Sequence, residues 1–193
     1  MDTDGFCTKP WEQDPVALAI QHDLVVFFDN FPGGGSRALA APIAEAFGAS
    51  LCQLRITTDG HMESKLGPKQ YAFGDGPCNN TRIQAIHGFL HITNMDFYRS
   101  ETVMKGIETL FGDCFLCRFP DDQLSVTIPA AILAPERAWD MRRNGVKLDV
   151  FHNLRLDGKD SEKTMGFKQL WKLKRTRQAM KEARGVCPIT EKM

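Results

Sequence analysis

A glycine-rich turn follows an apolar run of five residues. Residues 24–28 are rich in β-branched and aromatic side chains, which predicts a buried strand that ends at Asp29. Glycines between a strand and a helix let a phosphate approach free backbone amides, and an arginine adds positive charge. An anion site would here consist of Gly33, Gly34, Gly35, Ser36 and Arg37. The spacing fits neither a P-loop nor a dinucleotide-binding motif, so a plain turn is the alternative.

A second group of residues has the side chains that bind zinc. His87 and His91 are four positions apart, which puts both on one face of either a helix or a strand. Cys114 and Cys117 form a C-x-x-C pair, and two cysteines with two histidines complete a tetrahedral ligand set. The residues between the two cysteines are apolar and lack the glycine or proline of a metal knuckle. We therefore expect no cofactor and free, buried cysteines, with zinc or a redox pair as the alternatives.

Histidines could also serve in acid–base catalysis. Residues 58–81 are rich in glycine and proline and poor in apolar residues, and we expect a long loop there. His61 lies near the start of this stretch, and His87 follows it. Neither a G-x-S-x-G motif nor a recognisable cysteine nucleophile is present. His61 and His87 are therefore the first catalytic candidates, and ordinary surface or core histidines are the alternative.

The most extended pattern is a basic amphipathic helix near the C-terminus. Residues 166–184 are rich in lysine and arginine, and Glu182 is their one acidic residue. Their apolar residues recur at helical spacing. A basic face neutralises phosphates and releases counterions when it binds nucleic acid. Together with two upstream arginines, the predicted binding residues are Arg142, Arg143, Lys168, Trp171, Lys172, Lys174, Arg175, Arg177, Lys181 and Arg184. An acidic protein surface as partner, or a solvated helix whose Trp171 packs in the core, are the alternatives.

The charge balance points to the same end of the chain. The 193 residues include 24 basic and 24 acidic ones, so the formal net charge is zero. Residues 1–64 nevertheless contain three basic and nine acidic residues, whereas residues 135–193 contain fifteen basic and eight acidic ones. This asymmetry indicates either a basic surface for an acidic partner or two segments of opposite charge that fold against each other.

These patterns favour a non-enzymatic binding protein over an enzyme. We expect it to engage nucleic acid or a nucleoprotein complex through the basic C-terminal helix. A regulator or inhibitor that acts by protein contact is a close variant, in which the acidic N-terminal third mimics nucleic-acid charge. The alternative is a small enzyme that processes phosphate esters or nucleic acid with the glycine-rich turn and a histidine. The oligomeric state is not indicated.

The composition, 42% hydrophobic and 25% charged, is that of an ordinary globular protein. Residues 24–28 are far short of the roughly 20 apolar residues that span a bilayer. Asp2 and Asp4 stand where a signal peptide would carry basic residues. We therefore expect a cytoplasmic protein without a membrane span, whose six cysteines form no disulfide framework.

The periodicities predict an α+β fold in a single core domain. Strands are expected at residues 24–28, 51–57, 83–93, 114–119, 124–128 and 146–151. Helices are expected at residues 36–47 (or from near residue 41, because of Pro42), 100–111, 135–143 and 162–184. The first six elements follow the β-α-β-β-α-β order of a ferredoxin-like core, and an irregular α+β domain is the alternative. The expected divisions are a lead-in (1–15), a core domain (16–160) and a basic C-terminal helix and tail (161–193).

Overall fold

A computed structural model of the chain describes residues 6–7, 11–29, 40–67, 85–86, 90–112, 122–146 and 150–151. The chain divides into two compact units, residues 15–145 and a second unit made of residues 1–14 and 146–193. In the second unit, β1 (Phe6–Cys7) pairs antiparallel with β7 (Val150–Phe151). Within the described ranges, no helix is long and apolar enough to cross a membrane.

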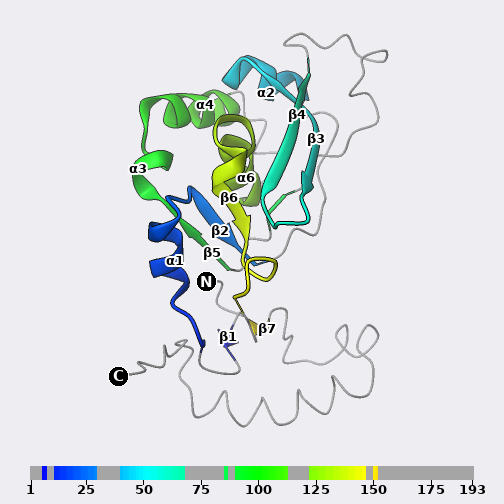
Figure 1. Cartoon of the computed structure of the whole chain (residues 1–193). Coiled ribbons are helices and arrows are strands. Elements are labelled where there is room, and N and C mark those ends of the chain that lie inside the picture. Colours follow the sequence, from blue (N-terminus) through cyan, green and yellow to red (C-terminus); the bar gives the residue numbers. More distant parts are fainter. Residues whose placement is uncertain are drawn as a thin grey trace, which may run out of the picture. The chain divides into compact units, whose positions relative to one another are not determined.

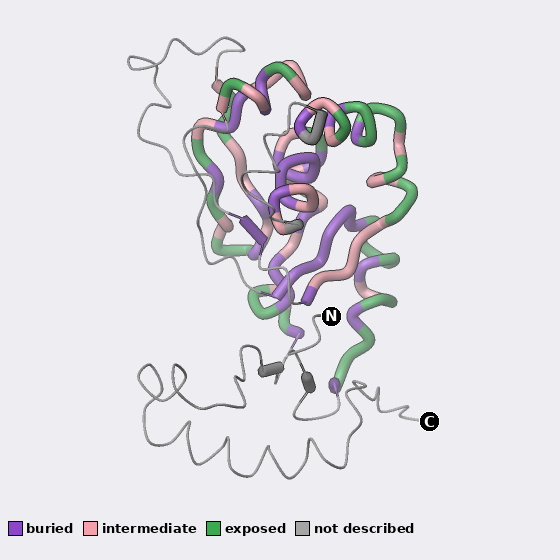
Figure 2. Tube along the Cα trace, turned by 180° about the vertical axis from the view of Figure 1, so that it is seen from behind, coloured by how far each residue is buried: buried purple, intermediate pink, exposed green. Residues whose placement is uncertain are grey.

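A three-stranded mixed sheet lies at the centre of the larger unit (Figure 1). Its middle strand is β2 (Val26–Phe28), which pairs antiparallel with β5 (His91–Thr93) and parallel with β6 (Ala138–Asp140). All three residues of β2 are buried, as the tube in Figure 2 shows. The apolar run that predicted this strand is therefore explained by neighbours on both edges and both faces.

A hairpin of β3 (Ser50–Ile56) and β4 (Met62–Gly67) lies beside this sheet. Its register shifts between Leu51 and Gln53, which makes Cys52 the extra residue of a β-bulge. Because of the bulge, Leu51 and Leu54 are both buried although they are three positions apart. An antiparallel bridge between His61 and Trp139 joins the hairpin to β6.

Helices close the core around these strands. The helix α2 (Ala40–Phe47) packs on α4 (Glu101–Gly112) and β3, while α6 (Asp122–Leu133) packs on α4 and the hairpin. The short helix α1 (Pro15–Gln21) contacts β2 and β5. The 3-10 turn η2 (Pro135–Arg137) leads from α6 into β6. The main apolar cluster draws on most of these elements and includes Val26, Phe28, Ile43, Leu51, Leu54, Leu110, Leu124, Ile128 and Ala138.

The helix α3 (Met95–Tyr98) is anchored by hydrogen bonds at both ends. The Asn94 side chain accepts hydrogen bonds from the backbone N–H groups of Asp96 and Phe97, as an N-cap does. The Tyr98 hydroxyl donates to the Val126 carbonyl of α6 at 2.8 Å, and burial raises the pKa of this phenol. The phenol therefore stays neutral, and its hydrogen bond intact, well into the alkaline range.

The α+β class is confirmed, and several elements lie where the sequence predicts them. The strands at residues 24–28 and 51–57 and the helix at 100–111 correspond to β2, β3 and α4. The predicted helix around Pro42 corresponds to α2, and residues 36–39, which would decide between its two predicted starts, lie outside the described residues. The predicted strand at 114–119 and helix at 162–184 lie outside the described residues.

Other predictions are wrong. Residues 124–128 belong to the helix α6 instead of a hairpin, and part of the predicted loop, residues 62–67, forms β4. Residues 138–140 form a strand in place of a helix. No element is predicted at residues 16–21, which belong to the helix α1. The described strands lie in three small sheets, so the ferredoxin-like core is not confirmed. Cys52 is disulfide-bonded, which differs from the expectation that the six cysteines form no disulfide framework.

The contact between α2 and α4 depends on a missing side chain. A Cβ atom built on Gly106 would lie 2.3 Å from Cε1 of Phe47, well inside van der Waals contact. We predict that Gly106→Ala lowers the free energy of unfolding by about 1–3 kcal/mol, because the Phe47 ring or the whole helix must move. Urea denaturation measures the change.

The Phe47→Ala background supplies the control. There the space is open, and Gly106→Ala should stabilise the protein by up to about 1 kcal/mol through helix propensity alone. An equal effect of the substitution in both backgrounds would contradict the packing explanation.

Candidate functional site

The carboxyl ends of β2 and β6 carry the charged groups that are most deeply placed in the larger unit. The two strands run parallel with Phe28 opposite Asp140, so Asp29 and Asp140 emerge at the same edge of the sheet. Asp29 is fully buried and Asp140 is nearly so. In open sheets with parallel strands, ligands bind at this edge.

Arg142 neutralises the buried carboxylate of Asp29. Its Nε donates to Oδ1 of Asp29, and its NH2 group donates to Oδ2 at 3.0 Å, which makes the contact bidentate. The side chain of Asp29 is 0% exposed and that of Arg142 is 54% exposed. The Arg142 guanidinium therefore lies between the buried Asp29 carboxylate and the surface, and Asp29 fixes its orientation.

Asp140 shapes the turn that presents Arg142. Its Oδ1 accepts hydrogen bonds from the backbone N–H groups of Arg142, at 2.8 Å, and Arg143, at 3.2 Å. Met141 donates its N–H to the Phe28 carbonyl at 2.8 Å, which holds the start of the turn against β2. The strand pairing and the Asp140 side chain together bring Arg142 over Asp29.

The same turn packs tightly on the loop of the hairpin. The Asp140 N–H donates to the Gly60 carbonyl, and Arg143 donates to the carbonyls of Ile56 and Thr57. Gly60 has a φ of +80°, and a Cβ there would lie 2.5 Å from Nδ2 of Asn144. Only glycine can occupy this position without strain. The hairpin loop therefore packs closely against the turn, on the side away from β2.

A second aspartate–arginine pair lies at the amino ends of the same strands. Arg137 donates from NH2 to Oδ1 of Asp23 at 2.7 Å and from Nε to the Asp23 carbonyl at 2.7 Å. Here the Asp23 side chain is 78% exposed. The two pairs thus have the same chemistry at opposite ends of the β2–β6 ladder, but only one of them contains a buried carboxylate.

His61, a predicted catalytic residue, lies against an aromatic ring. Its imidazole stacks on the indole of Trp139, with ring centroids 4.4 Å apart and planes tilted by 17°. His22 contacts the same indole at 4.7 Å. Trp139 precedes Asp140 in β6, so His61 lies beside β6 on the opposite side from β2 and Asp29.

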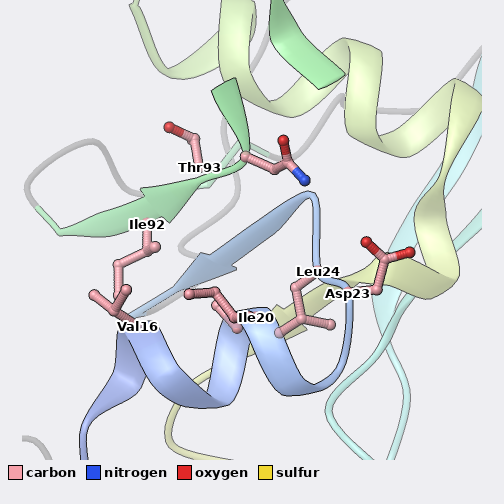
Figure 3. Close-up of a pocket in the computed structure, with 8 residues that line it drawn as sticks. Val16, Ile20, Asp23, Leu24, Ile92 and Thr93 are labelled. Atoms are coloured by element: carbon pink, nitrogen blue, oxygen red, sulfur yellow. The ribbon is translucent and has the colours of Figure 1, made fainter. Parts of the chain in front are cut away.

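A pocket of about 380 Å³ opens between α1 and β5. Figure 3 shows Val16 and Ile20 of α1 near Ile92 of β5, with Leu24 and Asp23 at the end of the helix. Its walls are mostly apolar. Because Asp23 is already paired with Arg137, the pocket offers no unbalanced charge that would select an ionic ligand.

The predicted site residues that the structure describes have definite partners. Arg142 binds Asp29, Arg143 binds backbone carbonyls, His61 stacks on Trp139, and His91 lies in β5 opposite Phe28. Within the described part of the chain, no group of three or more histidine, cysteine, aspartate or glutamate residues could hold a metal ion. The other predicted residues of the anion turn, the zinc set and the basic helix lie outside that part, as does His87.

The sequence reasoning missed the pairing of Asp29 with Arg142. The sequence predicts a strand that ends at Asp29 and a nucleic-acid surface that includes Arg142, but it does not predict that the two residues pair. The position of Asp29 directly after a fully apolar strand is the one signal that could have linked them, because a charged residue that is buried there needs a partner of opposite charge.

Comparison of the chain with protein-family models, with curated proteins and with solved structures finds no match.

The two aspartate–arginine pairs allow a matched test of the site. We predict that Asp29→Asn lowers the free energy of unfolding by about 1–3 kcal/mol, because it leaves Arg142 without its buried counter-charge. Asp23→Asn should change it by no more than about 0.5 kcal/mol, because exposed pairs contribute little. Asparagine also tolerates the positive φ of 51° at position 23.

Urea denaturation of the two variants and the wild type at neutral pH gives both values. Equal losses for the two substitutions would show that burial of Asp29 does not set the energetic importance of its pair.

Proposed function

We propose that the larger unit binds a phosphate-bearing substrate at the carboxyl edge of β2 and β6, and that the chain is a small enzyme that processes it. The single observation that carries this proposal is the Asp29–Arg142 pair. It presents a half-exposed, oriented guanidinium at the residue from which the glycine-rich segment departs.

The chemistry of the pair suits an anion. Guanidinium groups bind phosphate oxygens through paired N–H donors in a fixed plane. Two of the five N–H groups of Arg142 donate to Asp29, which fixes the plane of the guanidinium. A buried carboxylate that orients an arginine reduces the conformational entropy lost when an anion binds.

Two further features support the same location. The segment that follows Asp29 contains Gly33, Gly34 and Gly35, and the helix α2 begins at Ala40. A glycine-rich connection from a strand to a helix is the usual setting for phosphate contacts by backbone amides. Arg37, in this same segment, would add a second positive charge.

Acid–base chemistry at this edge would need a proton-transfer group. Asp140 lies at the edge itself, while His61 is one strand away, against Trp139. We therefore assign anion binding to Arg142 and the glycine-rich segment. Substitution of His61 tests the catalytic part of the proposal.

Anion binding is tested by titrating inorganic pyrophosphate into the full chain in a calorimeter. We expect the wild type to bind it and Arg142→Gln to weaken binding at least 10-fold. Arg137→Gln removes the same charge from the amino end of the strands and should change the affinity less than twofold. Circular dichroism of each variant shows whether the fold is retained.

Absence of binding to the wild type at 10 mM pyrophosphate, a concentration about ten-thousandfold above a dissociation constant of 1 μM, would overturn the anion site. Equal weakening by both substitutions would also overturn it, since that would reflect net charge alone. For the enzymatic part, release of phosphate from nucleotides that His61→Ala leaves unchanged would remove His61 from the mechanism.

The predicted basic C-terminal helix suggests a second function, binding of nucleic acid or of a nucleoprotein complex. The supporting observation is the excess of basic residues in residues 135–193. Most of the predicted binding residues lie outside the described part of the chain. Of the ten, Arg142 and Arg143 are described, and both are engaged by the larger unit itself. We therefore propose this function for the segment 168–184 alone.

A salt titration tests it. Fluorescence anisotropy with a labelled oligonucleotide should show an affinity that falls steeply as salt rises. Reversal of Lys174, Arg175 and Arg177 to glutamate should weaken binding at least 10-fold and flatten the salt dependence. Binding that survives the reversal would reject the helix as a nucleic-acid surface. Pull-down with and without nuclease then separates a nucleic acid from an acidic protein partner.

A further inference from the structure

Arg143 is bound to the loop that joins β3 to β4. Its Nη1 donates to the Thr57 carbonyl at 2.6 Å and to the Ile56 carbonyl at 3.3 Å. The Thr57 carbonyl also accepts the N–H of Gly60 at 3.0 Å, so two donors converge on this oxygen at the end of β3. The sequence predicts a nucleic-acid contact at Arg143, whereas in the structure its guanidinium binds the larger unit itself.

The hairpin loop and the turn that presents Arg142 are also in close contact through their backbones. A Cβ atom built on Gly60 would lie 2.7 Å from Cβ of Arg143, so the stem of this arginine lies against the glycine. The Asp140 N–H donates to the Gly60 carbonyl at 2.8 Å, and the Asn144 amide donates to the same carbonyl at 3.4 Å. Groups on both sides of Arg142 in the sequence therefore fix the turn to the hairpin loop.

We infer that Arg143 is a positioning residue, which ties the turn to the hairpin loop and so keeps Arg142 in the orientation in which it meets Asp29. The two arginines bind opposite neighbours of the turn, Arg142 at the carboxyl end of β2 and Arg143 on the hairpin. A turn that is tied on both sides has less conformational freedom than one tied on a single side, and the Arg142 contact then orders fewer dihedral angles.

The consequence for anion binding rests on the proposed function, but the orientation of Arg142 does not and can be measured without a ligand. A positioning residue and a direct anion ligand also differ in a measurable respect. A direct ligand contributes to the affinity whether or not Arg142 is present, whereas a positioning residue contributes only through Arg142.

Hydrogen exchange of the Arg142 Nε–H, followed by NMR in the isotope-labelled full chain without ligand, tests the inference. The signal is identified by its loss in Arg142→Gln. We expect Arg143→Met to raise the exchange rate of this N–H about fivefold, the factor that corresponds to one lost hydrogen bond, and to change the rates of the β2 backbone N–H groups by less than about twofold. Gly60→Ala should act in the same direction although it removes no charge, because its Cβ would displace Arg143.

Arg55→Met is the matched control. Arg55 belongs to β3 of the same hairpin, but it binds Glu63 of β4, so its removal should leave the Arg142 Nε–H unchanged. Unchanged exchange of this N–H in Arg143→Met would overturn the inference. An equal increase at Arg142 and in the β2 backbone would overturn it too, since that would reflect a loss of overall stability.

Calorimetric titration with pyrophosphate tests the consequence for the anion site. Arg143→Met should weaken binding about fivefold when Arg142 is present and should have no further effect in the Arg142→Gln background. Weakening by the same factor in both backgrounds would make Arg143 a direct ligand and would overturn its positioning role. A wild type that binds no pyrophosphate would refute the proposed function alone, and the exchange rate of the Arg142 Nε–H would still decide the role of Arg143.

Discussion

The parallel pairing of β2 with β6 is the constraint on which the rest of the larger unit depends. It joins two three-residue strands from distant parts of the chain, and it brings Asp29 and Asp140 to one edge. The strands are too short to be held by three residues of backbone pairing alone. Ion pairs at both ends of the two strands hold them together in addition. Asp23 binds Arg137 at the amino ends, and Asp29 binds Arg142 at the carboxyl ends.

The two pairs differ in what they contribute. An exposed pair gains little, because water screens it and both side chains must be ordered. A buried carboxylate costs several kcal/mol to desolvate and is tolerated only with a close, hydrogen-bonded partner. The pair of Asp29 with Arg142 therefore excludes alternative registers of β6 more than it adds net stability. A one-residue slip would leave Asp29 charged and unpaired in the core.

Elements with a clear local period could be predicted from the sequence, and those fixed by distant contacts could not. The helix α4 has its apolar residues at helical spacing, and β2 is an unbroken apolar run. The strand β6 contains only Ala138, Trp139 and Asp140, which is too short to show any period.

The error at α6 has a physical cause. Val126, Thr127 and Ile128 are β-branched, and Pro129 follows them, so the local propensity favours a strand. The buried positions Leu124, Thr127, Ile128 and Ala131 nevertheless recur at helical spacing, and tertiary packing overrides propensity. For the candidate site, the sequence indicated Asp29 and Arg142 separately. Their contact spans 113 positions, and no local pattern encodes it.

That separation has a consequence for how the protein is made. A ribosome adds roughly 5–20 residues per second, so β2 leaves it on the order of ten seconds before its parallel partner is complete. Until then one edge of a fully apolar strand has no partner, and Asp29 has no counter-charge. The edge of β2 that pairs with β6 is therefore open to pairing with other chains until residues 138–140 have been synthesised.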